Sequence, residues 1–270
     1  MSLYTLLLTA TAVSYFTAAV CYWRFLLKFS DKANRVAGFT LTAGFLLHTC
    51  ANIYVAPFAS LLGALLLITW ASVGLYLLMS QRHQIEVLGA VVSPFVLVVA
   101  IIARAFPQAT LSSVWEVGWE VGWSVLHITA SLFSYAGFSL AFIAGLVYIF
   151  QERMLKAKRV TALLNRLPSL DVMDRFAYHM VTIGFFLLTL GIISGSMWAS
   201  TAWGRFWSWS GKETWSLITW LVYAAYLHVR GIAGWHGRWA NRLLIIGFAC
   251  ILITFFGTSF ITPGFHGSCQ

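Results

Sequence analysis

Eight stretches of apolar residues constrain the fold of this 270-residue chain more than any other feature. A helix needs about 20 apolar residues to cross roughly 30 Å of bilayer hydrocarbon, where backbone polar groups have to be paired within the protein. We therefore predict an all-α integral membrane protein with about eight transmembrane helices, forming a single polytopic membrane domain over residues 1–270. The stretches span approximately 3–23, 37–55, 60–80, 87–106, 124–150, 177–199, 214–232 and 242–262.

The composition agrees with a membrane protein and excludes other classes. Charged residues make up 9% of the chain, whereas a soluble domain has about a quarter. The formal net charge of +9 does not indicate binding of nucleic acid, because the cations flank apolar spans. The four cysteines form neither a C-x-x-C pair nor a C-x-x-C-H motif, which argues against a dithiol oxidoreductase and against a c-type cytochrome.

The distribution of lysine and arginine predicts the sidedness of the spans, because cytoplasmic loops are enriched in these residues. The segments 24–35, 81–86, 151–176 and 230–242 hold 14 of the 17 cations. We expect these segments on the cytoplasmic side of a bacterial inner membrane, with 151–176 as a loop that begins in a short amphipathic helix, Gln151 to Asn165. Both termini and the segments 104–123, 199–213 and 263–270 are expected on the outer side.

Tryptophan is concentrated in and around the outward segment 199–213, which we call the tryptophan loop. Six tryptophans fall within the 23 residues of 198–220, more than anchoring at a membrane interface requires. Their indoles offer a large aromatic surface, and Gly204 and Gly211 allow close approach of the backbone. Haem, a planar, apolar and anionic molecule, fits such a surface, with its propionates meeting Arg205 and Lys212. The candidate haem-binding residues are Trp203, Gly204, Arg205, Trp207, Trp209, Lys212, Glu213 and Trp215.

Histidines at matching depths are candidates for the axial ligands of a haem iron. His127 lies at the outer start of the fifth span and His266 just beyond the eighth, so both share the side of the tryptophan loop. His228 lies near the inner end of the seventh span, and His48 lies in the middle of the second. Each of these histidines is either a ligand, at an outer or an inner haem site, or a polar packing residue bonded to a neighbouring helix.

A long and specific signature runs from Gly191 to Arg230. It contains Gly-Ile-Ile-Ser-Gly-Ser-Met-Trp-Ala, Trp-Gly-Arg-Phe-Trp-Ser-Trp, Lys-Glu-Thr-Trp and Tyr-Leu-His-Val-Arg. The run resembles the tryptophan-rich signature of the cytochrome c assembly superfamily that includes CcsA, CcmC and CcmF. Leu126-His127 and the terminal Pro263-Gly264-Phe265-His266 match the flanking histidine segments of that family. The chain is most similar to the CcsA (ResC) branch and to the related HemX-type proteins.

This resemblance implies that His127 and His266 are the axial ligands of a non-covalent haem b at the outer face. It also implies that His228 is the embedded histidine associated with haem entry from the cytoplasm. The second inner ligand then belongs to a CcsB (ResB) partner, or to a local substitute such as His48 or His179. The family usually reads Trp-Asp-Pro-Lys-Glu where this chain has Ser210-Gly211 before Lys-Glu, a change that removes a carboxylate and is expected to loosen the turn.

Together these features predict a haem-binding protein of cytochrome c biogenesis that presents haem at the outer face for covalent attachment to apocytochrome c. The expected partners are haem, a CcsB/ResB-like membrane protein, apocytochrome c, thiol-reducing proteins and the lipid bilayer. With no evident protein nucleophile, the chain would act as a component of a cytochrome c synthase. The alternative is a HemX-like regulator or scaffold of haem biosynthesis that contacts a soluble enzyme through 151–176. A transporter or a haem b protein carrying quinol electrons fits less well.

Overall fold

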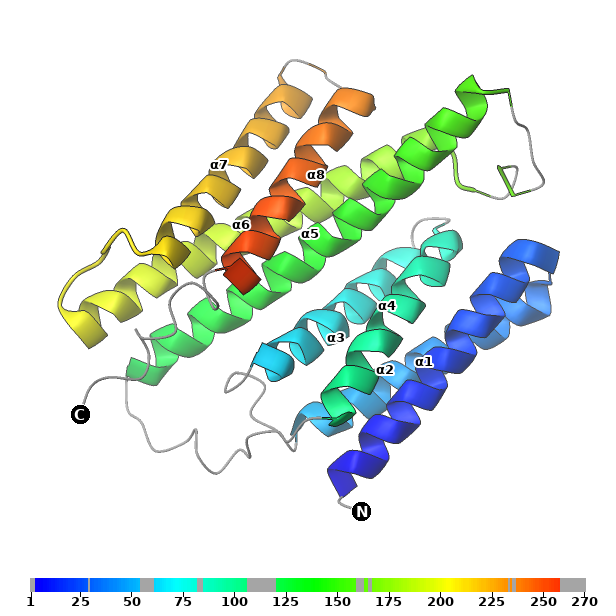
Figure 1. The fold of residues 1–270 in the computed structure, drawn as a ribbon, viewed down its shortest axis with the longest axis horizontal. Coiled ribbons are helices and arrows are strands. Elements are labelled where there is room, and N and C mark those ends of the chain that lie inside the picture. The colour runs from blue at the N-terminus through cyan, green and yellow to red at the C-terminus, as the bar shows by residue number, and fades with distance from the viewer. Residues whose placement is uncertain are drawn as a thin grey trace. The chain divides into compact units, whose positions relative to one another are not determined.

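Helices make up most of the part of the chain that the structure describes (Figure 1). The computed structural model describes residues 3–28, 30–53, 61–81, 85–105, 120–158, 163–164, 167–232, 234 and 237–257. Within these ranges there are eight α-helices, one short π-helix and no strand. The helices are α1 (Leu3–Lys28), α2 (Asp31–Ile53), α3 (Leu61–Ser80), α4 (Glu86–Ala105), α5 (Glu120–Lys156), α6 (Leu170–Trp203), α7 (Gly211–Gly231), α8 (Arg238–Leu252) and the π-helix η3 (Ile253–Gly257).

The outer surface of the helices is apolar, the reverse of a soluble protein. Large side chains such as Leu27, Phe39 and Ile232 are mostly exposed, which is unfavourable in water and favourable in a bilayer. Six helices are long and apolar enough to cross a membrane, namely α1, α2, α3, α5, α6 and α8 with its continuation to Phe256, and α4 contains a shorter apolar stretch. The chain is therefore a multi-pass helical membrane protein. Eight spans and two outward termini remain predictions.

Two helices extend well beyond the apolar stretches from which we predicted them. Helix α5 has 37 residues and α6 has 34, so each is about 50 Å long at 1.5 Å per residue, longer than the hydrocarbon layer.

The predicted loop 151–176 is thus helical at both ends. Its first six residues continue α5, where Lys156 pairs with Glu152 one turn earlier. The expected separate amphipathic helix, Gln151 to Asn165, is wrong, because residues 151–156 belong to α5 and the chain turns at 157–158.

The first compact unit contains α1 to α4 and the adjoining ends of α5, from Leu146, and α6, up to Ala177. Helix α1 packs against α2 and α4, and α3 packs against α2 and α4. A core cluster takes one buried residue from each of the four helices, namely Leu8, Ala51, Leu66 and Val99. Because lipid tails are as apolar as these side chains, close packing stabilises this contact more than removal from water does.

The second compact unit contains the rest of α5, with α6 from Tyr178, α7, α8 and η3. Figure 1 shows α7 and α8 side by side. Aromatic stacking links three helices, because Phe138 of α5 lies 3.7 Å from Tyr223 of α7 between ring centroids, and Phe142 of α5 stacks on Phe248 of α8. The Trp220 indole donates a hydrogen bond to Thr189, which joins α7 to α6. This bundle carries His127 and the tryptophan loop.

Candidate functional site

His127 is fixed against the neighbouring helix by a hydrogen bond to the backbone. Its Nδ1 lies 2.7 Å from the carbonyl oxygen of Gly191 in α6. A carbonyl oxygen only accepts, so Nδ1 has to carry the proton and donate. In a neutral imidazole this tautomer leaves the lone pair on Nε2, the state in which histidine binds a metal.

A glycine in α6 makes room for this ring. A Cβ added at Gly195 would lie 2.5 Å from Nδ1 of His127 and 2.8 Å from its Cε1, closer than any real contact. Gly191 approaches α5 in the same way, with Ser131 as its neighbour. The two glycines form a Gly-x-x-x-Gly pair, the pattern that brings membrane helices close together. The pair is a signal in the sequence for the close contact between α5 and α6 at His127. A search for ligand residues alone does not find it.

The irregular part of the tryptophan loop, residues 204–210, holds two residues in the left-handed region. Gly204 has a φ of 70° and Trp209 a φ of 56°, and the latter is uncommon for a bulky residue. Trp209 is 70% exposed, and Trp203 and Phe206 are also exposed. Trp207 is half-buried and meets Trp209 edge-on. A bulky residue at positive φ, such as Trp209, is a kind of backbone outlier that is enriched at ligand-binding sites.

Ser210 and Glu213 close the loop onto α7 through a capping box. The Ser210 hydroxyl accepts from the backbone N–H of Glu213, and the Glu213 carboxylate accepts from the backbone N–H of Ser210. The same carboxylate oxygen accepts from the backbone N–H and the hydroxyl of Ser208, each at 2.9 Å. Partial desolvation opposes the ionised carboxylate, but these bonds outweigh it and lower the pKa of Glu213 below its ordinary value.

This capping box shows that Ser210 orders the start of α7, while the loosening expected from Gly211 in place of proline stays a prediction. Serine and aspartate are both good N-cap residues, and proline is favoured at the first helical position, which Gly211 occupies. The aspartate carboxylate is absent here, whereas Glu213, which the family motif also contains, bonds to three donors in the turn. Ser208 and Ser210 thus join the site as positioning residues.

Helix α7 also brings a cation to the histidine. Lys212, in the first turn of α7, lies near enough for its charge to act on the His127 ring. Lys212 is exposed, as is Arg205 in the loop, which leaves both able to meet an anion. Trp215, one turn into α7, is half-buried.

The other predicted ligands have different surroundings. His228 is exposed on α7, two residues before Arg230, whose buried guanidinium lies 5.4 Å from the centre of the Tyr178 ring. His48 is fully buried in the first unit, with Nδ1 3.1 Å from the Tyr15 hydroxyl. A ring enclosed in this way fits the role of a polar packing residue. His266 lies outside the described residues.

The apolar helices define the class as a helical membrane protein, in which one unit carries both a histidine of fixed tautomer and an exposed aromatic loop. The chain belongs to the cytochrome C assembly protein family, whose profile matches residues 58–266. This match confirms the resemblance read from the sequence.

Individual relatives support the same assignment. The chain is 32% identical over 238 residues to the cytochrome c biogenesis protein CcsA of Prochlorococcus marinus, covering 78% of this chain and 74% of the relative. It is 28% identical over 314 residues to the CcsA protein of a Synechocystis species, covering 97% and 94%. Its fold is similar to the solved structure of cytochrome c heme lyase CcmF, with a TM-score of 0.68 at 17% identity, over 94% of this chain and 46% of that one.

Proposed function

We propose that this protein binds haem b at the outer face of a bacterial inner membrane through Nε2 of His127 and through His266. The observation that carries the proposal is the 2.7 Å bond from Nδ1 of His127 to the Gly191 carbonyl. A histidine that ligates a metal usually donates its other ring N–H in this way, which orients the ring and raises the basicity of the ligating nitrogen.

The remaining residues of the site fit an anionic, planar group. Arg205 and Lys212 are exposed cations for carboxylates such as propionates, and the exposed indoles of Trp203 and Trp209 offer faces for stacking. Glu213 does not oppose such an anion strongly, because its charge is already directed to the donors of Ser208 and Ser210. The capping box therefore orders the loop while the cations remain available.

Membership in the cytochrome c assembly family supports a role in cytochrome c biogenesis. In this role bound haem supplies vinyl groups that become covalently attached to cysteine thiols. The chain contributes by orientation, since His127, the tryptophan loop and the cations hold the group for an apocytochrome. A CcsB/ResB-like membrane partner and thiol-reducing proteins complete the system, and the chain is one component of a synthase.

At the other end of α7 we propose His228 as a ligand of an inner haem site on the entry path. Its ring is exposed, which leaves the imidazole accessible to a haem iron. His48 takes no part in this site. The relatives reported above are named for cytochrome c biogenesis, so they give no support to the alternative of a HemX-like regulator.

The test is the visible absorption spectrum, oxidised and reduced, of the protein purified in mild detergent. We expect the wild type to show a low-spin bis-histidine spectrum, and His127→Ala/His266→Ala to lose it. His83→Ala, in the predicted cytoplasmic segment 81–86, is the control and should keep the spectrum. In His127→Gly, added imidazole should restore part of the absorption, which separates loss of a ligand from misfolding. Full retention of haem by the double variant would contradict the proposal.

A further inference from the structure

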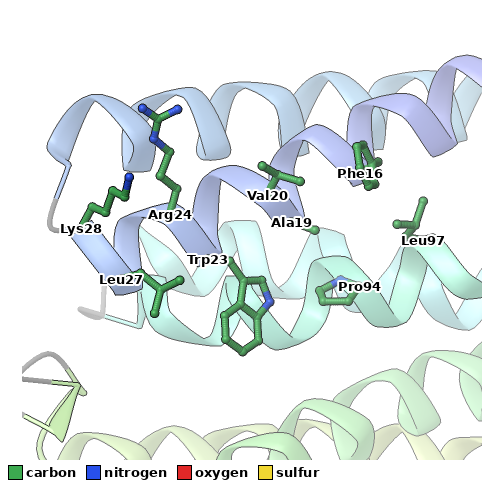
Figure 2. Close-up of a pocket in the computed structure, with 9 residues that line it drawn as sticks. All are labelled: Phe16, Ala19, Val20, Trp23, Arg24, Leu27, Lys28, Pro94 and Leu97. Atoms are coloured by element: carbon green, nitrogen blue, oxygen red, sulfur yellow. The ribbon is translucent and has the colours of Figure 1, made fainter. Parts of the chain in front are cut away.

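An apolar groove lies on the first unit between α1 and α4. It has a volume of about 480 Å³, within the range of sites that hold small molecules. Figure 2 shows Arg24 and Lys28 at one end of the groove and Phe16 and Leu97 at the other, with Trp23 and Pro94 between them. The groove thus has a cationic end and an apolar length.

The apolar part follows one face of α1 and a short part of α4. Phe16, Trp23 and Leu27 line it at helical spacing, and at least half of each side chain is exposed. Pro94 and Leu97 line the α4 side. The walls therefore offer contact surface for a hydrocarbon chain and few polar groups that such a chain would leave unpaired.

The cationic end combines Arg24 and Lys28, one helical turn apart and both exposed. Neither has an ion-pair partner among the residues that the structure describes, and no acidic residue lines the groove. Trp23 lies beside them, as tryptophan does at the level of lipid headgroups. Basic pockets between transmembrane helices are typical binding sites for anionic lipid headgroups.

We propose that this groove binds an anionic phospholipid, with one acyl chain along Phe16 to Leu27 and the phosphate group on Arg24 and Lys28. The charge of the site favours this occupant over a partner helix, because an apolar helix would leave both cations without an anion. The proposal does not depend on haem binding.

The test is lipid binding by the full-length protein in mild detergent, followed by native mass spectrometry. The probes are phosphatidylglycerol and phosphatidylcholine with the same acyl chains. We expect the wild type to bind phosphatidylglycerol at least about fivefold more tightly, because each cation near a headgroup adds to the attraction. Equal affinity for the two lipids would overturn the proposal. It would also be overturned if the protein bound neither lipid and carried a co-purified membrane protein over the groove.

Variants separate the two parts of the site. Arg24→Gln/Lys28→Gln should bind phosphatidylglycerol about tenfold more weakly. Arg238→Gln/Arg242→Gln removes two cations at the same spacing from α8 and should bind like the wild type. Val20→Trp fills the groove without changing charge and should weaken binding of both lipids. Wild-type affinity for phosphatidylglycerol in either groove variant would overturn the proposal. An equal loss of affinity in the α8 control would mean that the lipid responds to the overall charge of the protein, which would also overturn it.

Discussion

His127 and His48 form the same kind of contact in two different units of the molecule. In each, a ring nitrogen meets an oxygen of a neighbouring helix, and a glycine gives an aromatic ring room. Gly195 lies against the His127 ring, and Gly44 lies against the Tyr15 ring that bonds to His48. The oxygens differ, because a backbone carbonyl only accepts whereas a tyrosine hydroxyl accepts or donates.

This difference distinguishes His127, which we propose as a ligand, from His48, which we propose as a packing residue. The carbonyl of Gly191 fixes the tautomer of His127 and keeps Nε2 unprotonated in a half-buried ring. The Tyr15 hydroxyl leaves the tautomer of His48 open, and the whole side chain is buried, with Nε2 lacking a partner among the described residues. The hydrogen-bond partner and the burial of a histidine in a membrane helix therefore indicate a ligand role better than its depth in the bilayer does.

The largest expected effect comes from Gly195→Ala. The added Cβ would overlap the His127 ring, so the ring has to move and its bond to Gly191 is lost. Loss of such a supporting bond lowers metal affinity about tenfold or more. We expect the haem-to-protein ratio, measured by absorption after purification, to fall accordingly.

Gly44→Ala is the matched control for this experiment. Its Cβ would overlap the Tyr15 ring to a similar degree, so overpacking should lower stability by about 1–3 kcal/mol. Haem content per folded protein should remain at the wild-type level. An equal loss of haem in the two variants would show that the two contacts do not differ as we infer.

A smaller effect is expected from the Tyr15–His48 pair. Tyr15→Phe or His48→Leu leaves one buried polar atom without its partner and should each cost about 1 kcal/mol of unfolding free energy. The double variant removes both polar groups, so it should lose less than the two single effects combined. Reversible unfolding in detergent measures the coupling. Loss of the haem spectrum in His48→Leu would contradict the packing role.

Sequence reasoning predicted the helical membrane class and the family, because both depend on patterns along the chain. It did not predict the partner of His127, because the bond to Gly191 depends on how α5 and α6 are rotated against each other. The ends of α5 and α6 were also missed, since these helices continue as polar segments beyond the bilayer, where hydropathy no longer marks them. The spacing of Ser210 and Glu213 fits a capping box, which the sequence analysis did not predict. The comparison with the family motif had pointed only to the missing aspartate and proline.

The geometry of the capping box predicts that this chain accepts the family's Asp-Pro in place of Ser210-Gly211. Ser210 has φ −59° and ψ 158°, the conformation that a residue before proline prefers, and Gly211 is not in the left-handed region. Ser210→Asp/Gly211→Pro should therefore raise stability by about 0.5–1 kcal/mol, because proline restricts the unfolded chain. Ser210→Ala should lower it by about 1 kcal/mol. Thermal unfolding of the purified protein compares the two, and a destabilised double variant would contradict the N-cap geometry.

The smallest effect is a pH dependence that arises from Glu213. Its pKa is lowered in the folded protein by the donors of Ser208 and Ser210, so its ionised form stabilises the loop at neutral pH. That contribution declines once the pH falls below the ordinary carboxyl pKa and is lost as the pH passes through the lowered folded value. Thermal unfolding at a series of acidic pH values should show a steeper decline for the wild type than for Glu213→Gln, which has no charge to lose. The effect is small because the carboxylate is near solvent, and parallel profiles for the two proteins would mean that the capping box contributes no stability through this charge.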